Sequence, residues 1–289
     1  MKRNNKKIIS ILLLIFFINI SLVSTVSSNN QQEVQTISFQ ENTNNSKVYR
    51  AVIIGIGASQ GLPYSIRQIK GFKTNLLNNG NWEISNIKLI SEDQATKNNI
   101  KNYITWLDDN ADEDDVSLFY YVGHGGNRST DHYINTYDEL LYDYELTEYF
   151  ENISGTLIVF IDACKSGGFI DNLKNSNRII LTACDADENT YQVSDLGSGI
   201  FGYFINLSLT YLTKNVEPAF LFTKIFVQLY GRKLSREYGD DYVVHPQLYD
   251  GTQGRTRLMY RNTFGPGIMD SFMRFNLISN NNILWRMDN

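Results

Sequence analysis

Cysteine and histidine are scarce in this chain, which has only two cysteines and three histidines among 289 residues. Two cysteines allow one disulfide at most, between Cys164 and Cys184, and this bridge stays open as an alternative use of the thiols. No cysteine or histidine pair has the short spacing typical of zinc ligands, which argues against a zinc site.

Excess positive charge is absent too. The 26 basic and 31 acidic residues give a net charge of -5, with no basic block outside the N-terminus, which excludes a nucleic-acid-binding protein.

Apolar residues are plentiful enough for a large core. Hydrophobic residues make up 42% of the chain and aromatic residues 13%. A chain of this length and composition can bury one substantial core, so we expect one α/β domain with extensions.

The N-terminus has the pattern of a secretory signal peptide. The run "MKRNNKK" is basic, "IISILLLIFFINISLV" is apolar and "STVSS" is rich in small residues. The apolar run has 16 residues, fewer than the roughly 20 that span a bilayer, so we expect cleavage near Ser27 or Ser28 rather than a permanent anchor. Residues 29–48 are polar and lack periodicity, which is typical of a linker or pro-segment. The predicted organisation is a signal peptide (1–28), this polar segment (29–48), a folded domain (49–260) and a C-terminal tail (261–289).

Apolar strands and amphipathic helices alternate through the folded domain. We expect strands at 49–57, 86–91, 116–122, 155–164 and 178–184, and helices at 64–79, 98–109, 139–152, 200–213 and 218–236. Near-continuous apolar strands separated by helices predict an α/β fold, in which a mainly parallel sheet has helices on both faces. Ligands bind beyond the carboxyl ends of the strands in such a sheet.

Two of these strands lead into residues that carry chemistry. "DVSLFYYVGHGG" places His124 among glycines just past a strand, and "LIVFIDACKSGG" places Cys164 at the end of a strand. If the two strands are neighbours, the imidazole and the thiol project into one crevice, where Gly125 leaves a backbone N–H bare. A thiol, an imidazole and an exposed N–H are the parts that an acyl-transfer site needs. A lone cysteine at a strand end is usually a buried apolar residue, but the conjunction of all three groups favours a catalytic site.

The ordered pair "YYVGHGG" and, forty residues later, "FIDACKSGG" resembles the His-Gly and Ala-Cys motifs of the caspase-like cysteine peptidases. This superfamily includes caspases, metacaspases, legumains, gingipains and clostripain. The segments "LTACDADENTYQ" and "GSGIFGYFINLSL" are similar to further parts of these families, so the resemblance covers roughly residues 49–260. The branch stays open. Asp162, two residues before the cysteine, matches metacaspases, "TACDADENTY" resembles legumain, and Val122 stands where a metacaspase would have serine.

The resemblance implies a caspase-like three-layer sandwich and a Cys–His dyad. Cys164 is then the nucleophile, His124 the proton donor to the leaving amine, and Gly125 a contributor to the oxyanion hole. Asp162 is expected to select a basic substrate residue, with a purely structural role at the strand end as the alternative. Asp187, Asn189 and Thr190 are expected in the same substrate-binding pocket, and no side chain can be assigned to orient the histidine.

The predicted function is that of a secreted cysteine endopeptidase that cleaves proteins or peptides after Arg or Lys. A legumain-like asparaginyl endopeptidase or transamidase, and a catalytically inactive interaction module on the same fold, stay open as alternatives. The sequence indicates no metal and no cofactor, and activation by Ca²⁺ stays open without support from the sequence. A membrane would be a partner only if the N-terminal segment were retained as an anchor.

Overall fold

The computed structural model describes residues 47–254, 256–259 and 284–287, which all belong to the unit Ser46–Asn289. The expected signal peptide and nearly all of the expected linker lie outside the described residues and stay predictions. Among the residues that are described, no helix is long and apolar enough to cross a membrane.

A six-stranded sheet with the strand order β11-β8-β7-β3-β1-β2 forms the centre of the fold. Its first five strands in chain order are parallel, as the sequence predicts, and β11 adds an antiparallel edge next to β8 that the sequence analysis missed. The strands are β1 (Tyr49–Gly55), β2 (Ile87–Ser91), β3 (Val116–Val122), β7 (Thr156–Asp162), β8 (Arg178–Thr182) and β11 (Gln247–Asp250).

The five helical segments that the sequence predicts are all present, with changes at their ends. The helices are α2 (Ser65–Asn79), α3 (Lys97–Asn110), α4 (Asp143–Phe150), α5 (Phe169–Leu173), α6 (Ile200–Leu207) and α7 (Val216–Tyr238), with short 3₁₀ turns η1 (Ala58–Gln60), η2 (Ile84–Asn86), η3 (Glu92–Gln94) and η4 (Ser166–Gly168) and a π-helical turn η5 (Ser208–Leu212). The Thr96 hydroxyl accepts from the Asn99 N–H (3.2 Å) and so caps the start of α3. At the other end of a helix, α7 stops at Gly239, whose φ of 86° suits a residue without a side chain.

Two of the expected helices are shorter than predicted. The helix expected at 139–152 begins only at Asp143, because Leu140–Tyr142 forms a strand, β6, that pairs with its neighbour. The helix expected at 200–213 keeps α-helical hydrogen bonding only to Leu207, and the chain then widens into η5.

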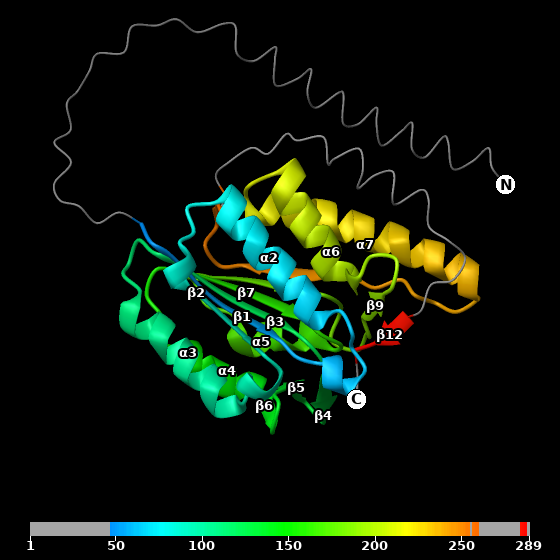
Figure 1. Ribbon diagram of the computed structural model, residues 1–289, viewed down its shortest axis with the longest axis horizontal. Helices are drawn as coiled ribbons and strands as arrows, with labels where there is room; N and C mark the ends of the chain where they lie inside the picture. Colours follow the sequence, from blue (N-terminus) through cyan, green and yellow to red (C-terminus); the bar gives the residue numbers. More distant parts are fainter. Residues whose placement is uncertain (1–46, 255, 260–283, 288–289) are drawn as a thin grey trace, which may run out of the picture. The chain divides into compact units, whose positions relative to one another are not determined.

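Side chains of the central strands alternate between two apolar clusters, one on each face of the sheet. Leu118 and Tyr120 of β3 pack in one cluster with residues of α2, α6 and α7. Phe119 and Tyr121 pack in the other with residues of α3, α4 and α5. Figure 1 shows these two helical layers on opposite sides of the sheet. Burial on both faces explains why the strands are apolar at almost every position, and the predicted three-layer α/β arrangement is confirmed.

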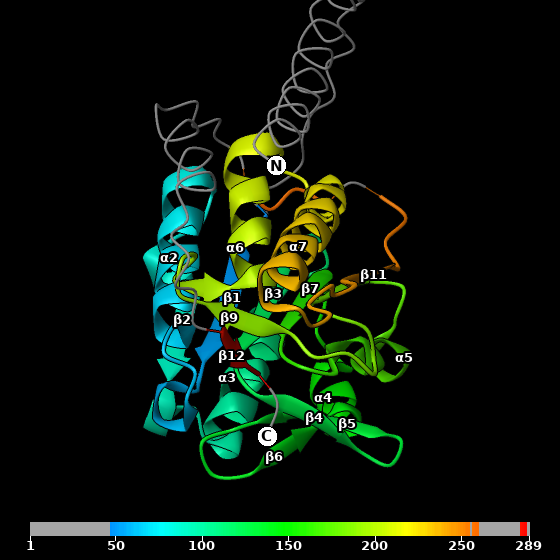
Figure 2. The same cartoon turned by 90° about the vertical axis from the view of Figure 1, so that its right-hand side faces the viewer.

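Two small antiparallel sheets lie beyond the central one, and neither was expected from the sequence. One contains β4 (Gly125–Arg128), β5 (Asp131–Asn135) and β6, the last of which lies in the segment that we expected to be helical. The other contains β9 (Tyr191–Val193), β10 (Ser198–Gly199) and β12 (Leu284–Arg286), the last of which comes from the expected C-terminal tail. Figure 2 shows β9 and β12 side by side.

Candidate active site

The strands that lead to the predicted histidine and cysteine are neighbours in the central sheet. β3 and β7 run parallel, with Val122 opposite Asp162 at their carboxyl ends. His124 and Cys164 each lie two residues beyond that pair, and the Gly123 N–H donates to the Asp162 carbonyl (3.3 Å). The structure therefore brings the imidazole and the thiol to the same edge of the sheet.

Gly125 lies where the turns after the two strands meet. A Cβ at this position would lie 2.8 Å from both the Ala163 Cβ and the Cys164 carbonyl oxygen, closer than real Cβ atoms come. Only glycine therefore allows the turn after β3 to pack on the turn after β7. The Gly125 N–H donates to the carbonyl oxygen of Met287 (3.1 Å).

The imidazole of His124 is oriented by a main-chain group. Its Nε2 lies 2.9 Å from the carbonyl oxygen of Gln60, at the end of η1. A carbonyl only accepts, so this bond requires Nε2 to carry the proton and leaves Nδ1 as the basic nitrogen. Nδ1 is buried and has no hydrogen-bond partner among the residues that the structure describes. The Tyr121 hydroxyl and the Asn135 N–H both bond the His124 carbonyl (2.8 and 3.0 Å), which fixes the backbone that presents the ring.

The thiol of Cys164 is buried against the loop that follows β8. The Thr190 N–H donates to the Cys164 Sγ (3.2 Å), and the Thr190 carbonyl oxygen lies 3.5 Å from the same sulfur. The thiol donates to that carbonyl and accepts from the N–H, and these two contacts hold the side chain in place. Thr190, which we expected to line the pocket, thus contacts the predicted nucleophile through its backbone.

Cys184 has a different environment, and both cysteines are thiols, so the disulfide left open by the sequence is not formed. Burial raises the pKa of Cys184 to about 12. Its Sγ lies 3.5 Å from the Ser166 hydroxyl, 3.4 Å from the Ala163 carbonyl and 3.3 Å from the Glu188 carbonyl. This thiol stays protonated at neutral pH and fills a structural position.

Asp162 is fully buried between the sheet and two helices. Its Oδ2 accepts from the Gln68 Nε2 on α2 (2.6 Å) and from the Gly202 N–H on α6 (3.0 Å). Burial raises the pKa of this carboxyl from 3.8 to about 6, although both hydrogen bonds oppose the rise. Its Oδ1 has no hydrogen-bond partner among the described residues. One oxygen of this buried acid, which lies two residues before Cys164 in the sequence, is thus left for another donor.

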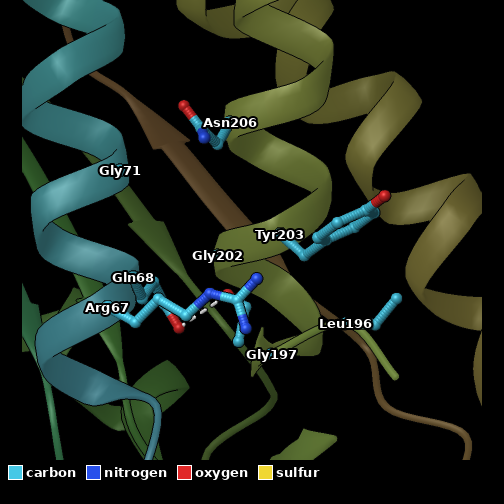
Figure 3. Close-up of a pocket in the computed structure, with 9 residues that line it drawn as sticks. Arg67, Gln68, Gly71, Leu196, Gly197, Gly202, Tyr203 and Asn206 are labelled. Carbon is cyan, nitrogen blue, oxygen red and sulfur yellow. Dashed lines mark hydrogen bonds between the residues drawn. The ribbon is translucent and has the colours of Figure 1, made fainter. Parts of the chain in front are cut away.

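A cavity of about 130 Å³ lies between α2 and α6; it is lined by Gln68 and Gly202, which both contact Asp162, but not by Asp162 itself. Figure 3 shows Arg67 and Gln68 extending from α2 toward Gly197 and Gly202. Gln68 is held in place because its Oε1 accepts from the Ser198 hydroxyl (2.9 Å) and the Gly199 N–H (2.7 Å). The acid therefore lies in a rigid polar network rather than on a flexible loop.

The other expected pocket residues lie on the loop between β8 and β9 and differ in exposure. Thr190 is buried and Asn189 is half-buried, whereas the Asp187 side chain is exposed. The Asp187 carbonyl accepts from the Lys165 amine, next to the predicted nucleophile. Of the three, Thr190 is the residue that the structure brings to the sulfur of Cys164.

The two remaining histidines stabilise other parts of the fold. His245 bonds Glu188 through its Nδ1 (2.5 Å) and its backbone N–H (2.7 Å), which anchors the loop before β9. His132 lies on β5, with its Nδ1 3.9 Å from an Asp143 carboxylate oxygen. Within the described part of the chain, no group of three or more His, Cys, Asp or Glu residues could hold a metal ion.

Sequence reasoning missed Gln60 and Gln68. Gln60 acts through its carbonyl oxygen, which every residue type has, so no side-chain pattern could identify it. Gln68 falls on a buried position of an amphipathic helix, and a polar residue at such a position was the one signal available.

Together these groups are of the kinds that acyl transfer requires. The site combines a thiol held by a backbone amide, an imidazole with an unengaged basic nitrogen, and a second backbone amide at Gly125. These are the components of nucleophilic catalysis with oxyanion stabilisation.

Comparisons with known proteins agree with this chemistry. Residues 49–173 match the family described as "Metacaspase, peptidase C14 domain". Metacaspase-1 of Candida albicans is 30% identical over an alignment of 152 residues that covers 42% of this chain and 34% of the relative, so the chain spans about a third of that protein. The crystal structure of caspase-1 from Spodoptera frugiperda has a TM-score of 0.56 at 13% identity and covers 81% of this chain and 99% of its own. The matches confirm the predicted resemblance: the chain is similar in sequence to metacaspases and has the α/β fold of the caspase-like cysteine peptidases.

Proposed function

We propose that this protein is a secreted cysteine endopeptidase that uses Cys164 and His124 as a catalytic dyad and cleaves after Arg or Lys. The observation that carries the proposal is that these two residues each lie two positions beyond the paired ends of the neighbouring strands β3 and β7. The Nδ1 of His124 also has no hydrogen-bond partner among the described residues. The metacaspase match over residues 49–173 supports the same class of reaction.

The mechanism starts with a proton transfer from the Cys164 thiol to the Nδ1 of His124. The thiolate attacks the carbonyl carbon of the scissile bond, and the N–H groups of Gly125 and Cys164 stabilise the negative oxygen. The imidazolium then gives its proton to the amine nitrogen, the C–N bond breaks, and a thioester remains. Water hydrolyses the thioester to the free acid and restores the thiol. Loss of one oxyanion donor in such a site costs about 3 to 4 kcal/mol of transition-state stabilisation.

The proposed basic specificity rests on Asp162. A buried carboxylate is costly unless a cation meets it, and the Oδ1 has no hydrogen-bond partner among the described residues. A substrate guanidinium or ammonium group would offset that cost and form a charge-assisted hydrogen bond. The pKa of about 6 means that Asp162 is mostly ionised at neutral pH, in the form that a cation requires.

Secretion is proposed from the N-terminal sequence alone. The basic run, the apolar run and the small residues up to position 28 have the order of a signal peptide. Protein or peptide substrates outside the cytoplasm are the expected partners.

The proposal is tested with four matched peptides that differ only in having Arg, Lys, Asn or Asp before the scissile bond. We expect kcat/KM to be about ten- to hundred-fold higher for the Arg peptide than for the uncharged Asn peptide, since a charge-assisted contact is worth about 1.5 to 3 kcal/mol. The Asp162→Asn variant should lose most of this preference and still react at Cys164 with a small alkylating agent. A preference for Asn or Asp would contradict basic specificity and leave the dyad in place, and added amine acceptors would reveal a transamidase.

A further inference from the structure

The strand β12 lies along β9 beside the proposed active site. The two strands are antiparallel, with Leu284 opposite Val193, Trp285 opposite Gln192 and Arg286 opposite Tyr191. The residue that precedes β9 is Thr190, which contacts the Cys164 sulfur. The pairing therefore ends directly at the predicted nucleophile.

Met287 continues this pairing with its N–H and reaches the turn after β3 with its carbonyl oxygen. Its N–H donates to the Thr190 carbonyl (3.1 Å), and its carbonyl oxygen accepts from the Gly125 N–H (3.1 Å). The Gly125 N–H is the proposed oxyanion donor. The carbonyl of Met287 therefore occupies the position that the proposed mechanism reserves for the carbonyl of a scissile bond.

The Met287 side chain is fully buried, in the same apolar cluster as Cys164, Tyr120 and Phe160. Methionine is an unbranched, flexible side chain that fills apolar space without a charge. Met287 can thus fill the cleft, although it lacks the positive charge that Asp162 is proposed to select in a substrate.

We propose that residues 284–287 are an intramolecular inhibitor that occupies the substrate cleft, with Met287 where a substrate places the residue before the scissile bond. The inference rests on the proposed function for the identity of the cleft, and it assigns β9 as the strand to which a substrate adds. An added strand binds mainly through main-chain hydrogen bonds, so a segment of this chain and a foreign peptide can use the same edge. The two occupants exclude each other.

The expected kinetic signature is competitive. A substrate binds only to molecules in which the segment has left the cleft, so the apparent KM is raised by the inverse of the open fraction while kcat is unchanged. If about one molecule in ten is open, release of the segment lowers KM about tenfold.

The test compares the full-length protein with Met287→Pro, which removes the N–H that bonds Thr190, and with Met287→Leu, which keeps this N–H and an apolar side chain. We expect Met287→Pro to lower KM for an Arg peptide about tenfold at unchanged kcat, and Met287→Leu to behave as the parent. A chain that ends at residue 283 serves as a second release variant if the proline prevents folding, which thermal unfolding would show.

A binding measurement separates this inference from the proposed function. A fluorescein-labelled Leu-Trp-Arg-Met amide is titrated into each protein in a Cys164→Ala background, where no turnover occurs. We expect the probe to bind the release variant about tenfold more tightly than the parent. Equal probe affinity and equal KM in folded proteins would overturn the inhibitor and leave the peptidase standing. If the release variant binds the probe more tightly but the proteins that keep Cys164 hydrolyse no peptide, the segment does occupy the cleft and the proposed peptidase activity is refuted.

Discussion

The carboxyl ends of β7 and β8 are neighbours with almost the same sequence and different surroundings. β7 leads into Asp-Ala-Cys and β8 into Thr-Ala-Cys, and the two strands pair in parallel. Cys164 is next to β3, whose turn carries His124, and receives a backbone N–H from Thr190. Cys184 is one strand further from β3 and is surrounded by carbonyl oxygens and the Ser166 hydroxyl. The comparison indicates that the proposed difference in reactivity between the two thiols comes from the neighbouring strand and loop rather than from the motif that holds each thiol.

Replacing each cysteine in turn is expected to give the largest difference between the two sites. Cys164→Ala should lower kcat for peptide cleavage by at least about 10⁴-fold, because the nucleophile is lost. Cys184→Ala removes a protonated, buried thiol and should keep most of the activity. Steady-state cleavage of one Arg peptide by both folded variants measures the difference, and a dead Cys184→Ala enzyme would place the nucleophile on β8 instead.

The histidines extend the same contrast. His124→Ala should reduce kcat/KM about 10²- to 10⁴-fold, since proton transfer to and from the reacting groups is lost. His132→Ala and His245→Ala should be far milder, because these residues contact Asp143 and Glu188 rather than the thiol. Comparable losses in all three variants, measured on the same peptide, would point to a structural cluster instead.

Asp162 and Thr182 occupy matching positions before the two cysteines, and only the first is an acid. Burial raises the pKa of Asp162 from 3.8 to about 6, and the ionised form is the one that attracts a cation. The ratio of kcat/KM for an Arg peptide to that for a norleucine peptide should therefore rise as the pH rises through about 6. The ratio should be flat in Asp162→Asn, and a wild-type ratio that does not change with pH would remove Asp162 from substrate selection.

The stability of the fold provides the mildest test of the β8 environment. The pKa of Cys184 rises from 9.0 in an unburied thiol to about 12 in the fold, so its contribution to stability is complete below pH 9. Between pH 9 and 12 the unfolded chain releases this proton and the folded chain retains it, which lowers the free energy of unfolding by about 1.4 kcal/mol per pH unit. Urea unfolding of wild type and Cys184→Ala over this range should differ by that slope, and parallel curves would show that Cys184 is not protected.

The sequence predicts the parts of this molecule whose signal lies in side-chain pattern. β3 and β7 were found because both faces are buried, and His124 and Cys164 because each follows such a strand among glycines. β4 and β5 escaped prediction because polar residues occupy them, as in "GGNR" and "DHYIN". β12 has three residues within a tail without periodicity, and its pairing with β9 is a tertiary contact that no local pattern encodes.

The acceptor that orients His124 has a consequence for how this site tolerates mutation. In many dyads a carboxylate or amide side chain holds the imidazole, so one base change can remove it. Here the acceptor is the peptide carbonyl of Gln60, which any replacement at that position also provides. The residue at position 60 can therefore be replaced at little cost to the orientation of the His124 ring. Insertions or deletions in the turn between β1 and α2, which displace the main chain itself, are the changes that selection must remove.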